Sequence, residues 1–109
     1  MKRWFITIHT APTPDCEAIE FALAMAAFDQ EVCLFFCQDG VWWLATEQAT
    51  RRDGGKNPEK LINALAMYGI TDIGVPFDAE LPSNIAVNIS YFSNEDVAQR
   101  MTQAHVVSF

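Results

Sequence analysis

Short apolar runs alternate with longer amphipathic segments through the chain. The runs are rich in β-branched and aromatic residues and too short for helices, so we expect them to form strands. The expected strands cover residues 3–10, 31–37, 71–75, 85–92 and 105–109. Apolar residues at three- and four-residue spacing predict helices over residues 13–29, 57–68 and 93–103. This alternation predicts an α/β fold, a three-layer domain with a mostly parallel five-stranded sheet.

Capping residues mark the starts of two predicted helices. Thr13 can cap the first helix, where Asp15 lies at the positive end of the helix dipole. Ser93 can cap the last helix, and Val97 and Met101 would form the buried side of that helix.

The composition indicates one folded domain over residues 1–109, because half of the residues are apolar. The formal net charge is −7, from fourteen Asp and Glu against seven Lys and Arg. Binding of nucleic-acid phosphates depends on clustered cations, and the only such cluster is Arg51, Arg52 and Lys56. The charge therefore argues against direct binding of DNA or tRNA and favours a basic or neutral protein partner.

The chain contains no sequence pattern of a membrane protein or of a secreted, disulfide-bonded one. No apolar stretch approaches the roughly 20 residues that cross a bilayer, so we expect no membrane span. The apolar run near the amino terminus is about six residues long, which suits a first strand better than a signal peptide. Three cysteines imply no disulfide framework. We therefore expect a cytoplasmic protein.

The strand predicted at 31–37 ends in the turn signal Cys-Gln-Asp-Gly. Loops at the carboxyl ends of parallel strands usually carry the function of such sheets, so we expect a site at this edge. The expected pocket residues are Thr10, Gln38, Asp39 and Gly40. One hypothesis is a small-ligand or nucleotide-binding module in this crevice. Because no glycine-rich loop follows the first strand, phosphate binding there is disfavoured.

The cysteines and histidines form no metal-binding pattern. Cys33 and Cys37 would share one face of a strand about 13 Å apart, too far for a disulfide or a compact metal pair. His9 and His105 have no ligand-like spacing to them, so we expect no metal site. We expect Cys16 and Cys33 to be buried in the core, as free cysteines commonly are.

Cys37 is the one thiol at the carboxyl end of a predicted strand. His9 lies near the end of the first strand and could serve as a base for this thiol. No cation lies beside Cys37 in the sequence, although a lowered thiol pKa normally needs one. The alternative is a packed cysteine and a hydrogen-bonded structural histidine.

Trp42 and Trp43 follow the turn directly. Adjacent residues point in different directions on regular structure, so we expect one of the two to face outward. Exposed tryptophan is enriched at the hot spots of protein interfaces. Both residues are therefore candidate interface anchors, and the alternative is that both pack into the core.

Four local matches in sequence order connect the chain to a known family. They are Thr-Ala-Pro at 10–12, Phe-Phe-x-x-Asp-Gly-Val at 35–41, Gly-Ile-x-Asp-Ile at 69–73 and the hydrophobic end at 106–109. With these motifs the chain resembles the DsrE/DsrF-like family of small sulfur-relay proteins, and most closely its TusC/DsrF branch. The matches extend over nearly the whole chain.

The resemblance implies a flavodoxin-like parallel sheet of about five strands and assembly as a trimer or hexamer. In the complexes of this family, a DsrE/TusD-like subunit carries a cysteine persulfide just after the third strand and works beside a DsrH/TusB-like subunit. The sulfur passes to a small TusE/DsrC-like partner. Its destination is either 2-thiolation of the tRNA wobble uridine or sulfur oxidation.

This chain departs from the family pattern at the persulfide position. That position falls at or next to Phe77, and no cysteine is present there. We therefore expect a non-catalytic TusC/DsrF-like subunit of a cytoplasmic sulfur-relay oligomer, an accessory subunit without a cofactor. One alternative is a persulfide-carrying sulfurtransferase that uses Cys37, and another is a homo-oligomeric small-ligand-binding protein.

Overall fold

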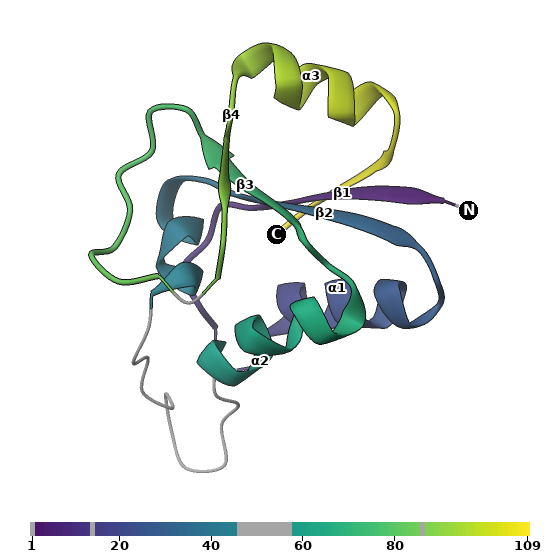
Figure 1. Cartoon of the computed structure of the whole chain (residues 1–109), viewed down its shortest axis with the longest axis horizontal. Helices are drawn as coiled ribbons and strands as arrows, with labels where there is room; N and C mark the ends of the chain where they lie inside the picture. The colour runs from purple at the N-terminus through teal and green to yellow at the C-terminus, as the bar shows by residue number, and fades with distance from the viewer. Residues whose placement is uncertain (1, 14, 46–57, 86) are drawn as a thin grey trace.

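A five-stranded parallel sheet forms the centre of the structure (Figure 1). The structure is a computed structural model that describes residues 2–13, 15–45, 58–85 and 87–109. The strands are β1 (Arg3–Ile8), β2 (Glu31–Phe36), β3 (Asp72–Pro76), β4 (Ser90–Phe92) and β5 (His105–Ser108). Their order across the sheet is β4-β3-β2-β1-β5. In register, Phe5 of β1 lies between Cys33 of β2 and Val106 of β5.

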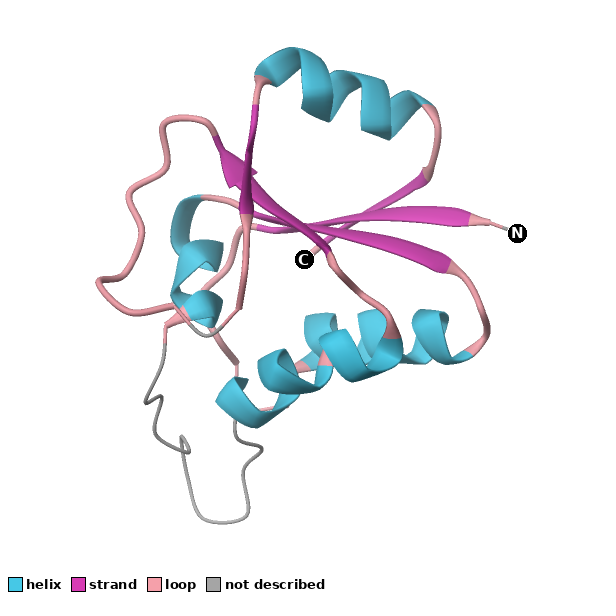
Figure 2. Cartoon of the chain, in the orientation of Figure 1, coloured by secondary structure: helices cyan, strands magenta, loops and turns pink. Residues whose placement is uncertain are grey.

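Helices cover both faces of the sheet, which gives three layers (Figure 2). Helix α1 (Glu17–Ala27) and helix α2 (Pro58–Ala64), which continues into the 3₁₀ turn η2 (Ala66–Tyr68), lie on one face, and α3 (Asn94–Thr102) lies on the other. The predicted three-layer α/β architecture is confirmed. Its strand order differs from the 2-1-3-4-5 of flavodoxin itself, so the likeness lies in the layers and the parallel strands. Within the described residues, no helix is long and apolar enough to cross a membrane.

The strands bury alternate side chains on the two faces, as a pleated strand requires. The larger apolar cluster lies on the face of α1 and α2 and includes Ile6, Ile8, Leu34 and Phe36. A smaller cluster lies on the face of α3, and it comprises Phe5, Cys33, Phe35 and Phe92.

The two predicted helix starts had different outcomes. Ser93 caps α3 as predicted, because its hydroxyl accepts a hydrogen bond from the Asp96 N–H at 3.1 Å. Thr13 does not cap α1: its hydroxyl donates to the Asp15 carboxylate at 2.8 Å, and the helix begins later, at Glu17. The N-cap is instead Cys16, which is buried as predicted and has a left-handed backbone with φ 53°.

Two further predictions, one for the fourth strand and one for α3, are wrong. Of the strand expected over residues 85–92, the last three residues pair with β3. Ile85 makes an isolated antiparallel bridge to Ala45 instead, and the half-buried Ile85, Val87 and Ile89 pack against the larger cluster. On α3, the expected buried residue Met101 is 37% exposed.

Candidate functional site

The carboxyl ends of β2 and β3 border a groove of about 600 Å³. One wall is formed by Cys37, Gln38, Val41 and Trp42, and the other by Pro76 and residues 78–82. The two walls meet because β2 and β3 are neighbours in the parallel sheet and end at the same edge. The edge at which the sequence predicts a site borders this groove, and the site itself stays a prediction.

The first wall is a 3₁₀ helix, η1 (Gln38–Leu44), which continues the predicted turn. Gly40 makes this arrangement possible: a Cβ atom at this position would lie 1.8 Å from the Ile8 carbonyl oxygen. The Gly40 N–H donates to the Cys37 carbonyl at 2.8 Å and starts the helix. Gln38 has a left-handed backbone with φ 52°, which is uncommon for a residue other than glycine. The backbone is thus closely constrained beside the groove.

The two tryptophans of η1 point in different directions, as predicted. Trp43 is 1% exposed, and its indole N–H donates to the Thr10 carbonyl at 3.0 Å. Trp42 is 54% exposed and lines the groove. Trp43 therefore serves the core of this chain and is unavailable as an interface anchor in this conformation, so the interface prediction reduces to Trp42.

Cys37 is half-buried in the groove wall. Burial raises the pKa of the Cys37 thiol, which disfavours the reactive thiolate. His9 is exposed, and its backbone N–H donates to the Phe109 carbonyl at 2.9 Å. Among the described residues, no hydrogen bond joins the side chains of His9 and Cys37, and His9 does not line the groove. The Cys–His pair stays a prediction from sequence.

The four predicted pocket residues do not share one cavity. Gln38 lines the groove, whereas Asp39 is exposed beside it and Gly40 is buried. Thr10 lines a separate hollow of about 370 Å³ with Trp43 and Phe109. The sequence analysis missed the opposite wall at residues 78–82. The chain turns directly after β3, where the Ala79 N–H donates to the Pro76 carbonyl at 3.0 Å, and this turn places the wall across from η1.

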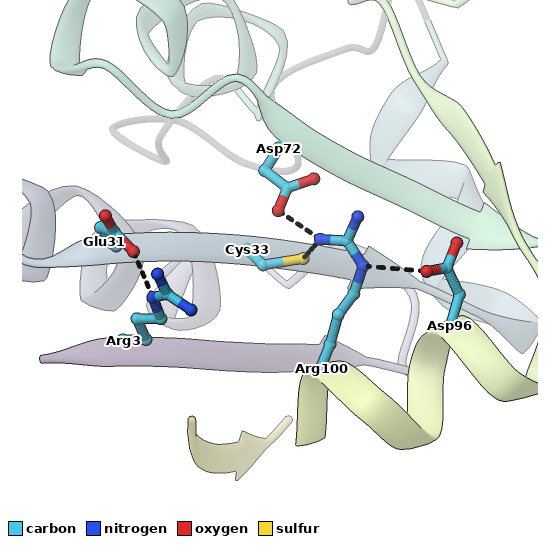
Figure 3. Close-up of polar contacts among 6 residues, drawn as sticks. All are labelled: Arg3, Glu31, Cys33, Asp72, Asp96 and Arg100. Carbon is cyan, nitrogen blue, oxygen red and sulfur yellow. Dashed lines mark hydrogen bonds and ion pairs between the residues drawn. The ribbon is translucent and has the colours of Figure 1, made fainter. Parts of the chain in front are cut away.

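A second polar cluster, which the sequence analysis missed, lies between α3 and the sheet (Figure 3). Arg100 of α3 forms an ion pair with Asp72 at the start of β3, and its guanidinium lies 4.1 Å from the centroid of the Phe92 ring. The same group donates to the Cys33 sulfur at 3.6 Å. Asp72 and Arg100 are 28 residues apart and on different elements, so no spacing rule could have paired them.

Burial is the main reason that Cys33 stays neutral. Burial, with the nearby Asp72 carboxylate as a second cause, raises the pKa of the Cys33 thiol to about 12, and Arg100 offsets only part of this effect. Cys33 is therefore a structural cysteine, as predicted. No group of three or more His, Cys, Asp or Glu side chains with the geometry of a metal site occurs among the residues that the structure describes.

Comparison with known proteins decides the family. The model of the DsrE/DsrF-like family matches residues 2–109. The chain belongs to the DsrE/DsrF-like family. It is 41% identical over 63 residues to the intracellular sulfur oxidation protein DsrF of Allochromatium vinosum, which supports the predicted DsrF branch. That match covers 58% of this chain and 46% of the relative, so the matched part spans less than half of the relative's length.

The fold of this DsrE/DsrF-like chain also occurs in a solved structure. The crystal structure of the ychN protein from E. coli superposes with a TM-score of 0.80 and covers 100% of both chains. The identity is 17%, so this likeness concerns the fold alone.

Phe77 lies in the turn after β3, where the family resemblance expects a persulfide cysteine. Its side chain is 59% exposed and offers no nucleophilic atom. This DsrE/DsrF-like chain has three cysteines, of which Cys16 and Cys33 are buried and Cys37 has a raised pKa. The carboxyl edge is therefore shaped as a groove with an exposed tryptophan and without an activated thiol among the described residues.

Proposed function

We propose that this protein is a non-catalytic, TusC/DsrF-like subunit of an intracellular sulfur-relay assembly. The observation that carries the proposal is that its thiols are buried or have a raised pKa. Phe77 occupies the position after β3. Burial raises the pKa of Cys33 and of Cys37, and Cys16 is enclosed in the core. A persulfide carrier needs a thiolate at an accessible position.

The match to DsrF supports sulfur oxidation as the pathway, because that relative's name states this role. Thiolation of tRNA is the second destination that the family resemblance implies. Either way, the protein acts through protein partners, with DsrE/TusD-like and DsrH/TusB-like subunits as the candidates for stable assembly and a TusE/DsrC-like protein as the candidate acceptor.

Trp42 is the proposed anchor of one such contact. A half-exposed indole has few rotatable bonds, so it loses little conformational entropy when a partner covers it. The surrounding groove gives a partner side chain a place to insert.

Intact mass tests the absence of sulfur carriage. Wild type and a Cys37→Ala variant are incubated with a persulfide donor, whose outer sulfur would move to a cysteine thiolate while the donor leaves as a thiol. We expect no sulfur on either protein. One added sulfur on wild type, lost in the variant, would instead establish the alternative carrier function, which the position of Cys37 in the groove favours.

Light scattering after size exclusion tests assembly. The protein is measured alone and with DsrE-type and DsrH-type subunits, and we expect a defined oligomer in one of these mixtures. Trp42→Ala should weaken that assembly by about tenfold or more, whereas Tyr68→Ala, a control at a similarly exposed aromatic residue on η2, should not. A protein that stays monomeric at high concentration in every mixture would refute the subunit role.

A further inference from the structure

The groove at the carboxyl edge is acidic on one wall. Asp78 and Glu80 line it with exposed side chains, and Asp39 is exposed next to the groove residue Gln38. The described lining residues include no Lys, Arg or His. None of these three carboxylates forms an ion pair with another described residue. The groove thus offers negative charge that the described part of the chain does not neutralise.

The opposite wall carries an exposed aromatic side chain. Trp42 is the exposed aromatic residue there, and Leu81 and Pro82 supply half-buried apolar surface across the groove. Indole rings attract cations over their faces, and the methylene stems of Lys and Arg pack on apolar surface while their heads stay solvated. An aromatic wall and an acidic wall on one groove are complementary to the two parts of a long basic side chain.

We propose that this groove binds a basic segment of a partner protein, with one Lys or Arg side chain inserted between Trp42 and the carboxylates of Asp78 and Glu80. This inference rests on the proposed function and specifies the chemistry of the partner at the same site. The stem of the inserted side chain packs on Leu81 and Pro82, and its charged head pairs with the acidic wall. Ion pairs at the rim speed and orient the encounter, while the indole contact holds the complex.

The acidic charge of the groove and of the chain favours a basic segment over the other possible occupants. The chain carries a formal net charge of −7, so a second copy or a nucleic acid would bring further negative charge to an acidic wall. A second cavity, of about 510 Å³, lies at the amino edge of the sheet and is lined by two arginines. Its arginines are already paired within the chain, Arg3 with Glu31 and Arg100 with Asp72.

Chemical-shift mapping with a matched pair of peptides tests the inference. The probe is the blocked peptide Lys-Leu-Arg-Leu-Lys, and its twin is Glu-Leu-Glu-Leu-Glu. The basic peptide should give saturable shifts of the Trp42 indole N–H and of the backbone amides of residues 78–81, and added salt should weaken its binding. The acidic twin should leave these signals unchanged.

Two variants with equal changes in net charge separate the groove from the general field of the protein. Asp78→Asn with Glu80→Gln should weaken binding of the basic peptide roughly three- to tenfold, as expected for two partly exposed charge pairs. Asp29→Asn with Glu95→Gln changes two exposed acids outside the groove and should leave affinity nearly unchanged.

Three results would overturn the inference. They are equal loss in both double variants, shifts scattered over the surface, and shifts at the groove that appear with protein concentration alone, which would make a second copy the occupant. The test is independent of sulfur chemistry. If peptide binding fails while Trp42-dependent assembly holds, the basic segment is refuted and the subunit role stands. If the peptide binds but the protein takes up sulfur at Cys37, the non-catalytic role is refuted and the groove assignment stands.

Discussion

Cys33 lies on β2 close to Asp72 and Arg100, and its neutral thiol contributes to stability in a pH-dependent way. In the folded chain its pKa is about 12, against an ordinary value of 9.0. Between these two values the unfolded thiol loses its proton while the folded one keeps it. The folded state then binds more protons than the unfolded state, so stability falls as pH rises.

We predict that this effect is measurable from pH 9 to 12. Over that window wild type should lose up to about 1.4 kcal/mol of unfolding free energy per pH unit more than Cys33→Ala does. Below pH 9 the two proteins should have parallel pH profiles, although the variant is less stable overall. Urea unfolding at a series of pH values measures both, and parallel profiles above pH 9 would contradict the raised pKa.

Gly40 is the second residue whose environment makes a sharp prediction. Gly40→Ala would place a methyl group against the Ile8 carbonyl oxygen, a rigid backbone atom, so we expect a loss of about 1–3 kcal/mol. Because η1 carries Trp42 and Trp43 and would have to shift, the tryptophan fluorescence of the protein should also change. Gly69→Ala is the control: it costs about 1 kcal/mol through its φ of +82°, but the added methyl meets no atom within 4 Å and η1 stays in place.

At the scale of elements, α3 has the weakest apolar attachment among the α-helices that the structure describes. It buries none of its side chains fully, and Arg100 supplies its main polar contacts with the sheet. The guanidinium joins an ion pair with Asp72 to a cation–π contact with Phe92. The contacts of one charged residue therefore attach α3 to the sheet, whereas buried apolar residues attach α1.

Arg100→Met should loosen α3. We expect a loss of about 1–2 kcal/mol in urea unfolding, from a partly exposed ion pair and one cation–π contact. The matched control is Arg3→Met, which breaks a more exposed pair with Glu31 and should cost less than about 1 kcal/mol. Equal losses in the two variants would show that Arg100 is only a surface cation.

The elements also show what a sequence can and cannot predict. The strands and the Ser93 cap followed from local periodicity and hydrogen-bonding chemistry, which depend on neighbours in sequence. The segment at 85–89 alternates like a strand but packs against the larger cluster. Whether a segment finds a neighbouring strand to pair with depends on the whole sheet and not on the local sequence. The Arg100 contacts and the groove wall at 78–82 were missed for the same reason.

At the scale of the whole molecule, the described α-helices cover the two faces of the sheet unequally, with α1 and α2 on one face and α3 on the other (Figure 1). Local opening follows the amount of apolar surface that a segment buries. The central strands β1 and β2 together contain eight buried residues, and α1 contains three.

Native-state hydrogen exchange should therefore follow a definite order. Amides of α3 should exchange before those of α1, and amides of β1 and β2 should exchange last, close to the rate of global unfolding. The measurement needs wild type alone, with Arg100→Met as a variant in which α3 exchanges earlier still. Protection of α3 equal to that of β1 would contradict the order.

The unequal burial of the three thiols also has a practical consequence. Cys16 and Cys33 are closed off inside the fold, whereas Cys37 lies in the groove wall beside Trp42. A thiol-reactive fluorophore applied to the native protein should accordingly attach at one position, slowly but selectively. The protein thus has a natural place for an optical reporter at the edge of its sheet, where the arrival of a partner could be followed in real time.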